Sequence, residues 1–372
     1  MNRLGPLLFH SFRHQAQRPK LSAFAILNTA RSIHTSQKMQ QQLLFAPKDA
    51  HAASGAIFVD STWFMPGTPR SAYEEWKQRR IPGARFLDLD AVASQHPLGL
   101  KHMMPSGEVF AKACGEQKWV SNPAHNYDTH GVFSSPRALY MFKVRHITPN
   151  SAAKNLIVTL FARTELRPRK SRHPGWWAAS LGSRRSAYRN GRTERQGPVY
   201  EVYHTQAERI PYEQIVANAK LDPSSAPAAE LVLDARPYGR FTGEQPEPRP
   251  GLSSGHIPHA HSLPFSTLLE KHESGKGYTT VLPRDQLKAV FDKAVGDNGR
   301  GRSIVAVSIH SVGHYIGIEF EWLVLAQSCG SGMTAGTIWL AGQLLDTPVA
   351  IYDESWTGYA MRPESVIIKG DK

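Results

Sequence analysis

The chain has 372 residues, of which 41% are hydrophobic and 9% aromatic, and this length leads us to expect two domains. No apolar run reaches the roughly 18 residues of a membrane-spanning helix, so we expect no membrane partner. The net charge of +13 gathers largely in residues 1–40 and 163–195, not on one recognisable helix, so we expect no nucleic-acid partner. Cys114 and Cys329 lie far apart and predict no disulfide framework, which favours a reducing compartment.

Residues 1–39 contain no Asp or Glu and are rich in Arg, Ser and Ala, with scattered Leu and Phe. This composition is typical of a mitochondrial transit peptide, because a cationic amphipathic helix is drawn inward by the membrane potential. We therefore expect the mature protein in the mitochondrial matrix. A basic tail without a targeting role is the alternative.

Two later segments are alike in type. Residues 56–64 read "AIFVDSTWF" and residues 231–241 read "LVLDARPYGRF", and an "IP" dipeptide and a second short apolar run follow each one. The apolar runs that end in Asp predict buried parallel strands. Their separation of about 170 residues predicts two copies of one α/β domain. We expect domains at 44–205 and 206–372, with a Pro- and Ser-rich linker at 219–230.

The sequence of the second copy predicts a succession of helices and strands. "RDQLKAVFDKAV" predicts an amphipathic helix, "RSIVAV" a strand, "GTIWLAGQLL" a helix, and "PVAIYDESWTGY" a further strand and turn. Between the first strand and the apolar helix lies "SCGSGMTA", which contains Cys329. Open α/β sheets bind ligands at the carboxyl ends of their strands, which is where this cysteine loop (residues 329–335) is predicted to lie.

The cysteine loop suits an anionic sulfur. Successive backbone amides and the amino end of the following helix would favour the thiolate of Cys329. Gly330 and Gly332 let the backbone curl, and Ser331 and Thr334 offer hydroxyl donors. We therefore interpret Cys329 as a nucleophile whose cradle also suits a persulfide or a phosphate oxyanion. The alternative is a buried cysteine beside a turn. The other thiol, Cys114 in "EVFAKACGEQ", lies on a predicted apolar helix face, and we interpret it as core packing.

The chain resembles the tandem-domain rhodanese family of sulfurtransferases. The likeness is carried, in order, by "VDSTWFMPG", "RIPGARFLDLDAV", "HMMPSGEVFA", "YDTHGVFSSPRALYMF", "VLDARPYGRFTGEQPEPRPGLSSGHIPHAHSLPF" and "CGSGMTAG". These segments cover most of 56–143 and 231–368. The resemblance implies an α/β fold of two tandem rhodanese-like domains, each a mainly parallel sheet flanked by helices, with the catalytic cysteine in the second.

In the family the thiolate takes sulfur from a donor, forms a persulfide and passes the sulfur to a thiol or cyanide, without metal or organic cofactor. The match assigns the nucleophile to Cys329. Gly330 and Ser331 follow it where thiosulfate-preferring members carry cationic residues, which resembles the 3-mercaptopyruvate type. Thiosulfate remains the second donor. The expected partners are small molecules, with thioredoxin as a candidate acceptor, and we expect a monomer.

The resemblance also implies roles for other residues. Two arginines that grip the carboxylate and carbonyl of the donor match Arg240 and Arg249, and a guanidinium binds a carboxylate in bidentate fashion. A proposed proton-handling set of Ser, Asp and His matches Ser331, Asp90 and His102. For Asp90 and His102, hydrogen bonding at a domain interface is the alternative. The remaining expected substrate contacts are Gly330, Gly332, Met333 and Thr334.

Three stretches depart from the family pattern. Residues 307–327 intervene where members run from the strand directly into the cysteine loop, and we interpret them as a translated intron. Residues 144–196 are Arg-rich where members carry a strand and helix. Shifting the reading frame by one nucleotide over part of this stretch restores the motif "FGHESHVILDGG", so we interpret it as a retained intron followed by an exon in the wrong frame. The segment before Tyr127, "SNPAHN", lacks the expected β-branched run. We therefore expect weak activity of the chain as written.

Two other functions use the same fold. A cysteine phosphatase has a longer loop that usually ends in Arg, and residues 329–335 lack that Arg. A non-catalytic rhodanese-like binding module would need neither the cysteine nor both arginines, all of which are present. Sulfur transfer by purified protein separates these alternatives.

Overall fold

The computed structural model describes the helices and strands of both predicted copies and the loops around them. The described residues are 44, 57–116, 124–145, 147–148, 157–158, 201–202, 209–271, 277–299, 301–307 and 332–370. The predicted transit peptide, most of 144–196 and residues 308–327 lie outside them. Within these ranges, no helix has the length and apolar character that crossing a bilayer requires.

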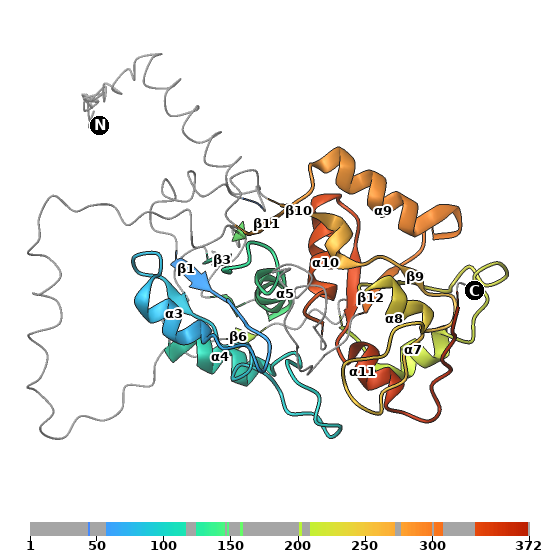
Figure 1. Ribbon diagram of the computed structural model, residues 1–372, viewed down its shortest axis with the longest axis horizontal. Coiled ribbons are helices and arrows are strands. Elements are labelled where there is room, and N and C mark those ends of the chain that lie inside the picture. Colours follow the sequence, from blue (N-terminus) through green and yellow to red (C-terminus); the bar gives the residue numbers. More distant parts are fainter. Residues whose placement is uncertain are drawn as a thin grey trace, which may run out of the picture. The chain divides into compact units, whose positions relative to one another are not determined.

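A first sheet forms from the earlier part of the chain (Figure 1). Its strands lie in the order β2 (Arg85–Phe86), β1 (Ile57–Asp60), β3 (Ala124–Tyr127) and β5 (Ile157–Val158), and all neighbours are parallel. The helices described in this half are α3 (Ala72–Gln78), α4 (Gly107–Glu116) and α5 (Ser135–Arg145). The strands β4 (Ile147–Thr148) and β6 (Glu201–Val202) form a separate antiparallel pair.

A second sheet forms from residues 209–352. Its strands lie in the order β7 (Arg209–Ile210), β13 (Val349–Tyr352), β12 (Ile304–Val307), β8 (Leu231–Asp234) and β9 (His261–Ser262), and all neighbours are parallel. Its helices are α7 (Tyr212–Asn218), α8 (Tyr238–Thr242), η4 (Phe265–Leu268), α9 (Arg284–Gly299), α10 (Ala335–Leu344) and α11 (Ser355–Ala360). The strands β10 (Leu269–Lys271) and β11 (Thr279–Val281) form an antiparallel pair. The predicted α/β class with two mainly parallel sheets is confirmed.

The central strands of the second sheet match their sequence. All four residues of β8 and all four of β12 are buried. Strands covered on both faces need continuous apolar side chains, which "LVLD" and "IVAV" supply almost throughout. Their carboxyl ends meet, since Val307 pairs with Asp234. The chain leaves β12 at this edge, and this is where the site is expected.

The predicted linker at 219–230 is wrong as a domain junction. β7 and α7 precede it, yet β7 pairs with β13 of the second sheet. The segment therefore connects two elements of one sheet. The guanidinium of Arg302 donates to the carbonyl oxygens of Ala226, Pro227 and Ala229, which fixes the turns. Proline and serine marked a surface connection, but composition did not distinguish it from a boundary.

Strand β3 forms although its sequence, "AHNY", lacks β-branched residues. It pairs with β1 on one side and β5 on the other, so pairing on both edges overrides a weak intrinsic preference. The cost is visible at Asn126, whose fully buried amide oxygen and nitrogen have no hydrogen-bond partner among the described residues. A polar side chain in this position agrees with the departure predicted before Tyr127.

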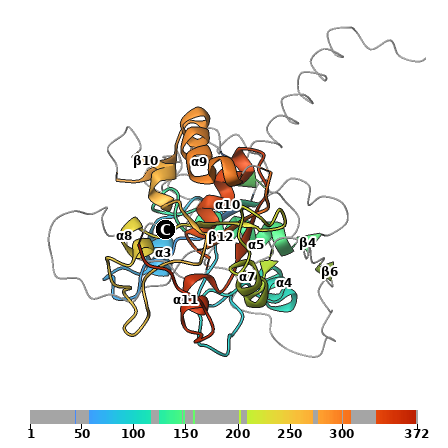
Figure 2. The ribbon, with the colours of Figure 1, turned by 90° about the vertical axis from the view of Figure 1, so that its right-hand side faces the viewer.

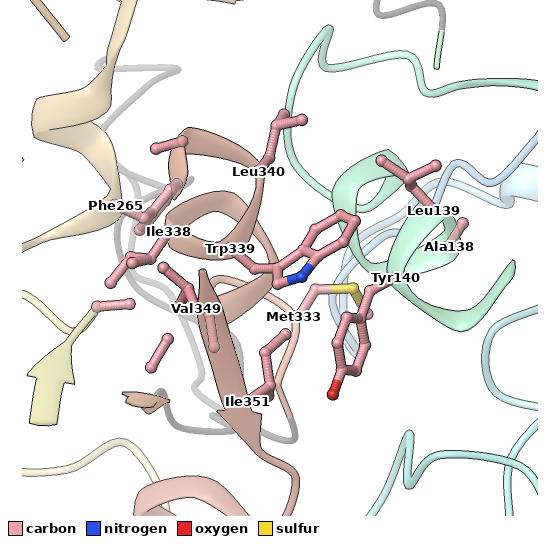
Figure 3. Packing of buried hydrophobic residues seen from close by; sticks show 14 of the residues in the cluster. Ala138, Leu139, Tyr140, Phe265, Met333, Ile338, Trp339, Leu340, Val349 and Ile351 are labelled. Carbon is pink, nitrogen blue, oxygen red and sulfur yellow. The ribbon is translucent and has the colours of Figure 1, made fainter. Parts of the chain in front are cut away.

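The core runs from one half of the described chain into the other. Helices α5 and α10 lie side by side in both ribbon views (Figures 1 and 2). α10 is buried on all sides from Ala335 to Gly342, as expected for a helix that is apolar all round. Tyr140 of α5 meets Trp339 of α10 in a T-shaped contact with ring centroids 5.3 Å apart (Figure 3). Gly336 allows this approach, because a Cβ there would lie 3.0 Å from the backbone nitrogen of Arg137.

Candidate functional site

The two halves present equivalent loops. In the first half, β3 leads through residues 128–134, the Asp128 loop, into α5. In the second half, β12 is followed by the segment that contains the cysteine loop, and then by α10. Both loops therefore lie between the carboxyl end of a parallel strand and the start of a helix, which is the position predicted for the site.

The Asp128 loop is an anion nest filled by its own side chain. Oδ2 of Asp128 accepts hydrogen bonds from the backbone amides of Phe133, Ser134 and Ser135 at 2.8–3.0 Å. Oδ1 accepts from the amide of His130 at 2.8 Å. The carboxylate is completely buried, and it takes the orphan N–H groups at the start of α5. A loop in this position can therefore hold a buried anion with backbone amides.

The described part of the cysteine loop begins at Gly332, and Cys329, Gly330 and Ser331 lie outside the described residues. Gly332 has φ of 71°, which favours glycine. Its amide donates to Oγ of Ser355 at 3.1 Å, so the N–H of this expected substrate contact already has a protein partner. Thr334 lies directly before α10 and makes no side-chain capping hydrogen bond. Met333 is completely buried in the core.

Asp90 and His102 lie together, as the resemblance implied. Nε2 of His102 is 2.5 Å from Oδ1 of Asp90. The His102 side chain is 2% exposed, whereas that of Asp90 is 62% exposed. The indole N–H of Trp63 donates to Oδ2 of Asp90 at 3.0 Å, and the Trp63 ring lies edge-on to the His102 ring with centroids 5.0 Å apart. His102 itself has φ of 56°, an unusual backbone conformation that this packing holds in place.

A buried ion pair joins this segment to the second half. Nη2 of Arg137, in α5, donates to Oδ1 of Asp353 at 2.7 Å and to the backbone carbonyl of His102 at 2.9 Å. Oδ2 of Asp353 accepts from the amide of Met104 at 2.7 Å. Asp353 follows β13 directly and lies two positions before Ser355, which bonds to Gly332. The His102 segment and the end of the cysteine loop are therefore fixed to the same turn.

A second cluster of charged side chains begins at Asp234, the last residue of β8. The guanidinium of Arg236 is fully buried and bonds to Asp234 and to Oε1 of Glu247, the latter at 2.7 Å. Arg240, in α8, is 6% exposed, and its Nη1 has no partner among the described residues. Burial lowers the pKa of Arg240, while the charge of Glu247 opposes that shift. Arg249 is half-buried two residues beyond Glu247. Of the predicted arginine pair, Arg240 thus lies near the buried Glu247 carboxylate and keeps a buried, unpaired donor among the described residues.

The structure adds three residues that the sequence did not single out: Trp63, Arg137 and Asp353. Trp63 and Arg137 stand within the motifs that carried the resemblance, but composition gives no sign that an arginine is buried. The described residues contain no group of three His, Cys, Asp or Glu side chains that could hold a metal ion.

Known proteins resemble this chain over most of its length. A probable 3-mercaptopyruvate sulfurtransferase of Schizosaccharomyces pombe is 30% identical over 316 residues, which cover 83% of this chain and 88% of the relative. A solved sulfur transferase subunit of yeast mitochondrial complex I is 27% identical, with a TM-score of 0.62 over 88% of this chain and 99% of that one. SseA of Escherichia coli, a 3-mercaptopyruvate sulfotransferase described as having the rhodanese fold, is similar in fold with a TM-score of 0.55 at 22% identity, over 83% of this chain and 95% of that one. No protein-family model matches the chain.

Proposed function

Since the chain belongs to the family of 3-mercaptopyruvate sulfurtransferases, which are transferases of the rhodanese fold, we propose that Cys329 carries sulfur from a donor to an acceptor as a persulfide. The proposed donor is 3-mercaptopyruvate, with thiosulfate as the second choice. The proposed acceptor is a thiol, such as that of thioredoxin, or cyanide. The reaction as proposed needs neither a metal nor an organic cofactor.

The proposed reaction has two displacements. The thiolate of Cys329 attacks the sulfur of 3-mercaptopyruvate, an S–S bond forms, and the C–S bond breaks with its electron pair going to carbon. The resulting enolate takes up a proton and leaves as pyruvate. An acceptor thiolate then attacks the outer sulfur of the persulfide, the S–S bond breaks, and the Cys329 thiolate is restored.

The observation that carries this proposal is the filled nest at Asp128. That loop occupies the position in the first half that the cysteine loop occupies in the second, and its amides hold a buried anion. A sulfur anion at Cys329 would meet the same kind of surroundings at the start of α10. Because Asp128 already fills its own nest, we propose that only the second half is catalytic.

The arginines and the acid–base pair have separate proposed roles. Arg240 and Arg249 bind the carboxylate and carbonyl of the donor, which would give the open Nη1 of Arg240 a partner. Ser331, Asp90 and His102 handle the proton that the enolate needs. His102 is suited to this because its ring is held by Asp90, and Asp90 is held in turn by Trp63. The amides of Gly330, Met333 and Thr334 complete the proposed donor site.

We also propose the setting in which the reaction takes place. A yeast structure similar to this chain is of a mitochondrial sulfur transferase, which supports the matrix and a transit peptide at 1–39 as the proposed location and signal. The proposed domains are 44–205 and 206–372, and the proposed active form is a monomer. Residues 307–327 and part of 144–196 are proposed to be absent from the product of the spliced gene.

Turnover tests the proposed function. Purified protein is given 3-mercaptopyruvate and cyanide, and pyruvate and thiocyanate are measured together. We expect equal amounts of both products, loss of both in Cys329→Ser, and retention of both in Cys114→Ala, whose thiol is buried in the core. Pyruvate and thiocyanate formation that survives Cys329→Ser would refute the proposal. A protein that binds the donor but forms neither product would instead be a binding module.

A further inference from the structure

Arg137 belongs to the first half of the chain, yet its side chain lies against the loop of the second. A Cβ placed on Gly332 would come within 2.6 Å of Nη1 of Arg137 and 3.3 Å of its Cζ. The guanidinium therefore lies directly on the backbone of the cysteine loop, three positions after Cys329. Glycine at position 332 makes room for it.

The guanidinium has spare donors in a place shielded from solvent. Arg137 is 1% exposed. Its Nη2 is used by Asp353 and by the His102 carbonyl, but Nε and Nη1 have no hydrogen-bond partner among the described residues. Buried N–H groups of a charged side chain are costly to leave unpaired, so a partner is expected beside Gly332.

The other contacts of Arg137 hold it rigidly. Asp353 balances its charge, Tyr140 lies beside it with the ring centroid 5.6 Å from Cζ, and the Gly336 end of α10 packs on its backbone. One side chain thus contacts the His102 segment, the turn after β13 and the cysteine loop. Moving any one of these would disturb the other two.

We propose that Arg137 is a positioning residue of the sulfur-transfer site, which holds the cysteine loop against the His102 segment and stabilises the anionic sulfur of Cys329. This inference rests on the proposed role of Cys329. The unpaired Nε and Nη1 groups of Arg137, beside Gly332, are the donors that this role requires. A buried cation near a thiolate favours the charged form of the thiol.

The test is the pH dependence of Cys329 alkylation by iodoacetamide, measured by mass in a Cys114→Ala background so that a single thiol is counted. The double variant Arg137→Met/Asp353→Asn removes both charges at similar volume, and the amide oxygen that Asp353→Asn introduces can still accept from the Met104 N–H. We expect the alkylation midpoint to rise by about one pH unit, since an opposite charge within a few ångströms shifts a pKa by about one to three units. Arg137→Lys, which keeps the charge but loses the planar fork, should lie between this variant and the parent.

In steady-state kinetics, the double variant should affect kcat much more than KM. We expect kcat to fall at least about tenfold, with less than about a twofold change in the KM for 3-mercaptopyruvate, because the donor is bound by other arginines. Arg284→Gln, at an exposed ion pair, is the matched control and should change neither quantity.

Each outcome decides the inference. If the parent protein forms a persulfide and the folded double variant keeps the parental midpoint, the role of Arg137 is refuted while the proposed function stands. If the parent forms no persulfide, both are refuted. If the double variant does not fold, Arg137→Lys decides: a parental midpoint together with a parental kcat contradicts the inference, and a raised midpoint supports it.

Discussion

Nη2 of Arg137 and Oδ1 of Asp353 lie 2.7 Å apart, and their side chains are 1% and 3% exposed. The pair joins α5, in the first half of the chain, to the turn after β13, in the second. Taking two charges out of water is costly, so the pair contributes through its geometry: the carboxylate also accepts from Met104 and the guanidinium donates to His102. The site that we propose is therefore shared between the two halves.

Asp353→Ala should destabilise the protein strongly, because it leaves the Arg137 charge buried without a partner. Breaking a buried pair from one side costs about 3–5 kcal/mol. The measurement is the free energy of unfolding in urea, with Asp346→Ala, at an exposed ion pair, as the control. A loss of less than about 1 kcal/mol in Asp353→Ala, no larger than for an exposed pair, would show that the contact does not join the halves.

Arg240→Gln should raise the KM for 3-mercaptopyruvate by roughly tenfold or more, because a hydrogen bond to a charged group contributes about 1.5–3 kcal/mol. Arg249→Gln should act in the same direction. Initial rates over a range of donor concentrations give KM and kcat separately. The exposed Arg284→Gln serves as the matched control. An unchanged KM in both variants would refute their assignment to the donor carboxylate.

Glu247 should make stability depend on pH. Burial raises the pKa of Glu247 from 4.5 to about 7, while the charges of Arg236 and Arg240 oppose the shift. The folded chain therefore keeps this proton up to about pH 7, whereas the unfolded chain loses it near pH 4.5. The contribution of Glu247 to the free energy of unfolding is fully present below pH 4.5 and is lost as the pH rises through about 7.

Glu247→Gln removes that titration. The difference in unfolding free energy, variant minus wild type, should be larger at pH 8 than at pH 5 by an amount on the order of 1–3 kcal/mol, because only wild type loses this stability as the pH rises. Urea unfolding at both pH values measures this difference, with the exposed Glu244→Gln as the control. If wild type and Glu247→Gln differ equally at both pH values, the raised pKa is wrong.

The sequence predicted the parts of the fold in which apolar residues run without a break. β8 and β12 are such runs, and both form fully buried strands. β3 was harder to predict, because "AHNY" has no strand preference of its own and depends on pairing with β1 and β5. The 219–230 segment was misjudged because composition carries no information on which strands lie beside each other. Only the pairing of β7 with β13 reveals that.

Site residues could be predicted from the sequence only where they match a position in a family motif. Asp90 and His102 came from the resemblance, and they do lie together. Their support by Trp63 and their link to the second half through Arg137 could not be predicted, because both depend on contacts between residues far apart in sequence. Charged residues are almost always exposed, so nothing in the sequence marks Arg137 as buried.

Deleting residues 307–327 should raise sulfurtransferase activity. The deletion joins Ala306 of β12 to Ser328, so the strand would lead directly into the cysteine loop, as in the family pattern. We expect kcat/KM to rise at least about tenfold, a gain of about 1.4 kcal/mol in transition-state stabilisation. The same deletion with Cys329→Ser should stay inactive. Sequencing of the spliced transcript gives an independent check, and a mature transcript that keeps these codons in frame would contradict the interpretation.

The central claim is that Cys329 carries the transferred sulfur. The most direct measurement is the intact mass of the protein after exposure to 3-mercaptopyruvate and removal of excess donor. We predict a gain of one sulfur atom that cyanide removes, that maps to the peptide containing Cys329, and that persists in Cys114→Ala, because burial raises the pKa of the Cys114 thiol and keeps it unreactive. A gain that remains in Cys329→Ser, or no gain in a protein that still releases pyruvate, would contradict the account.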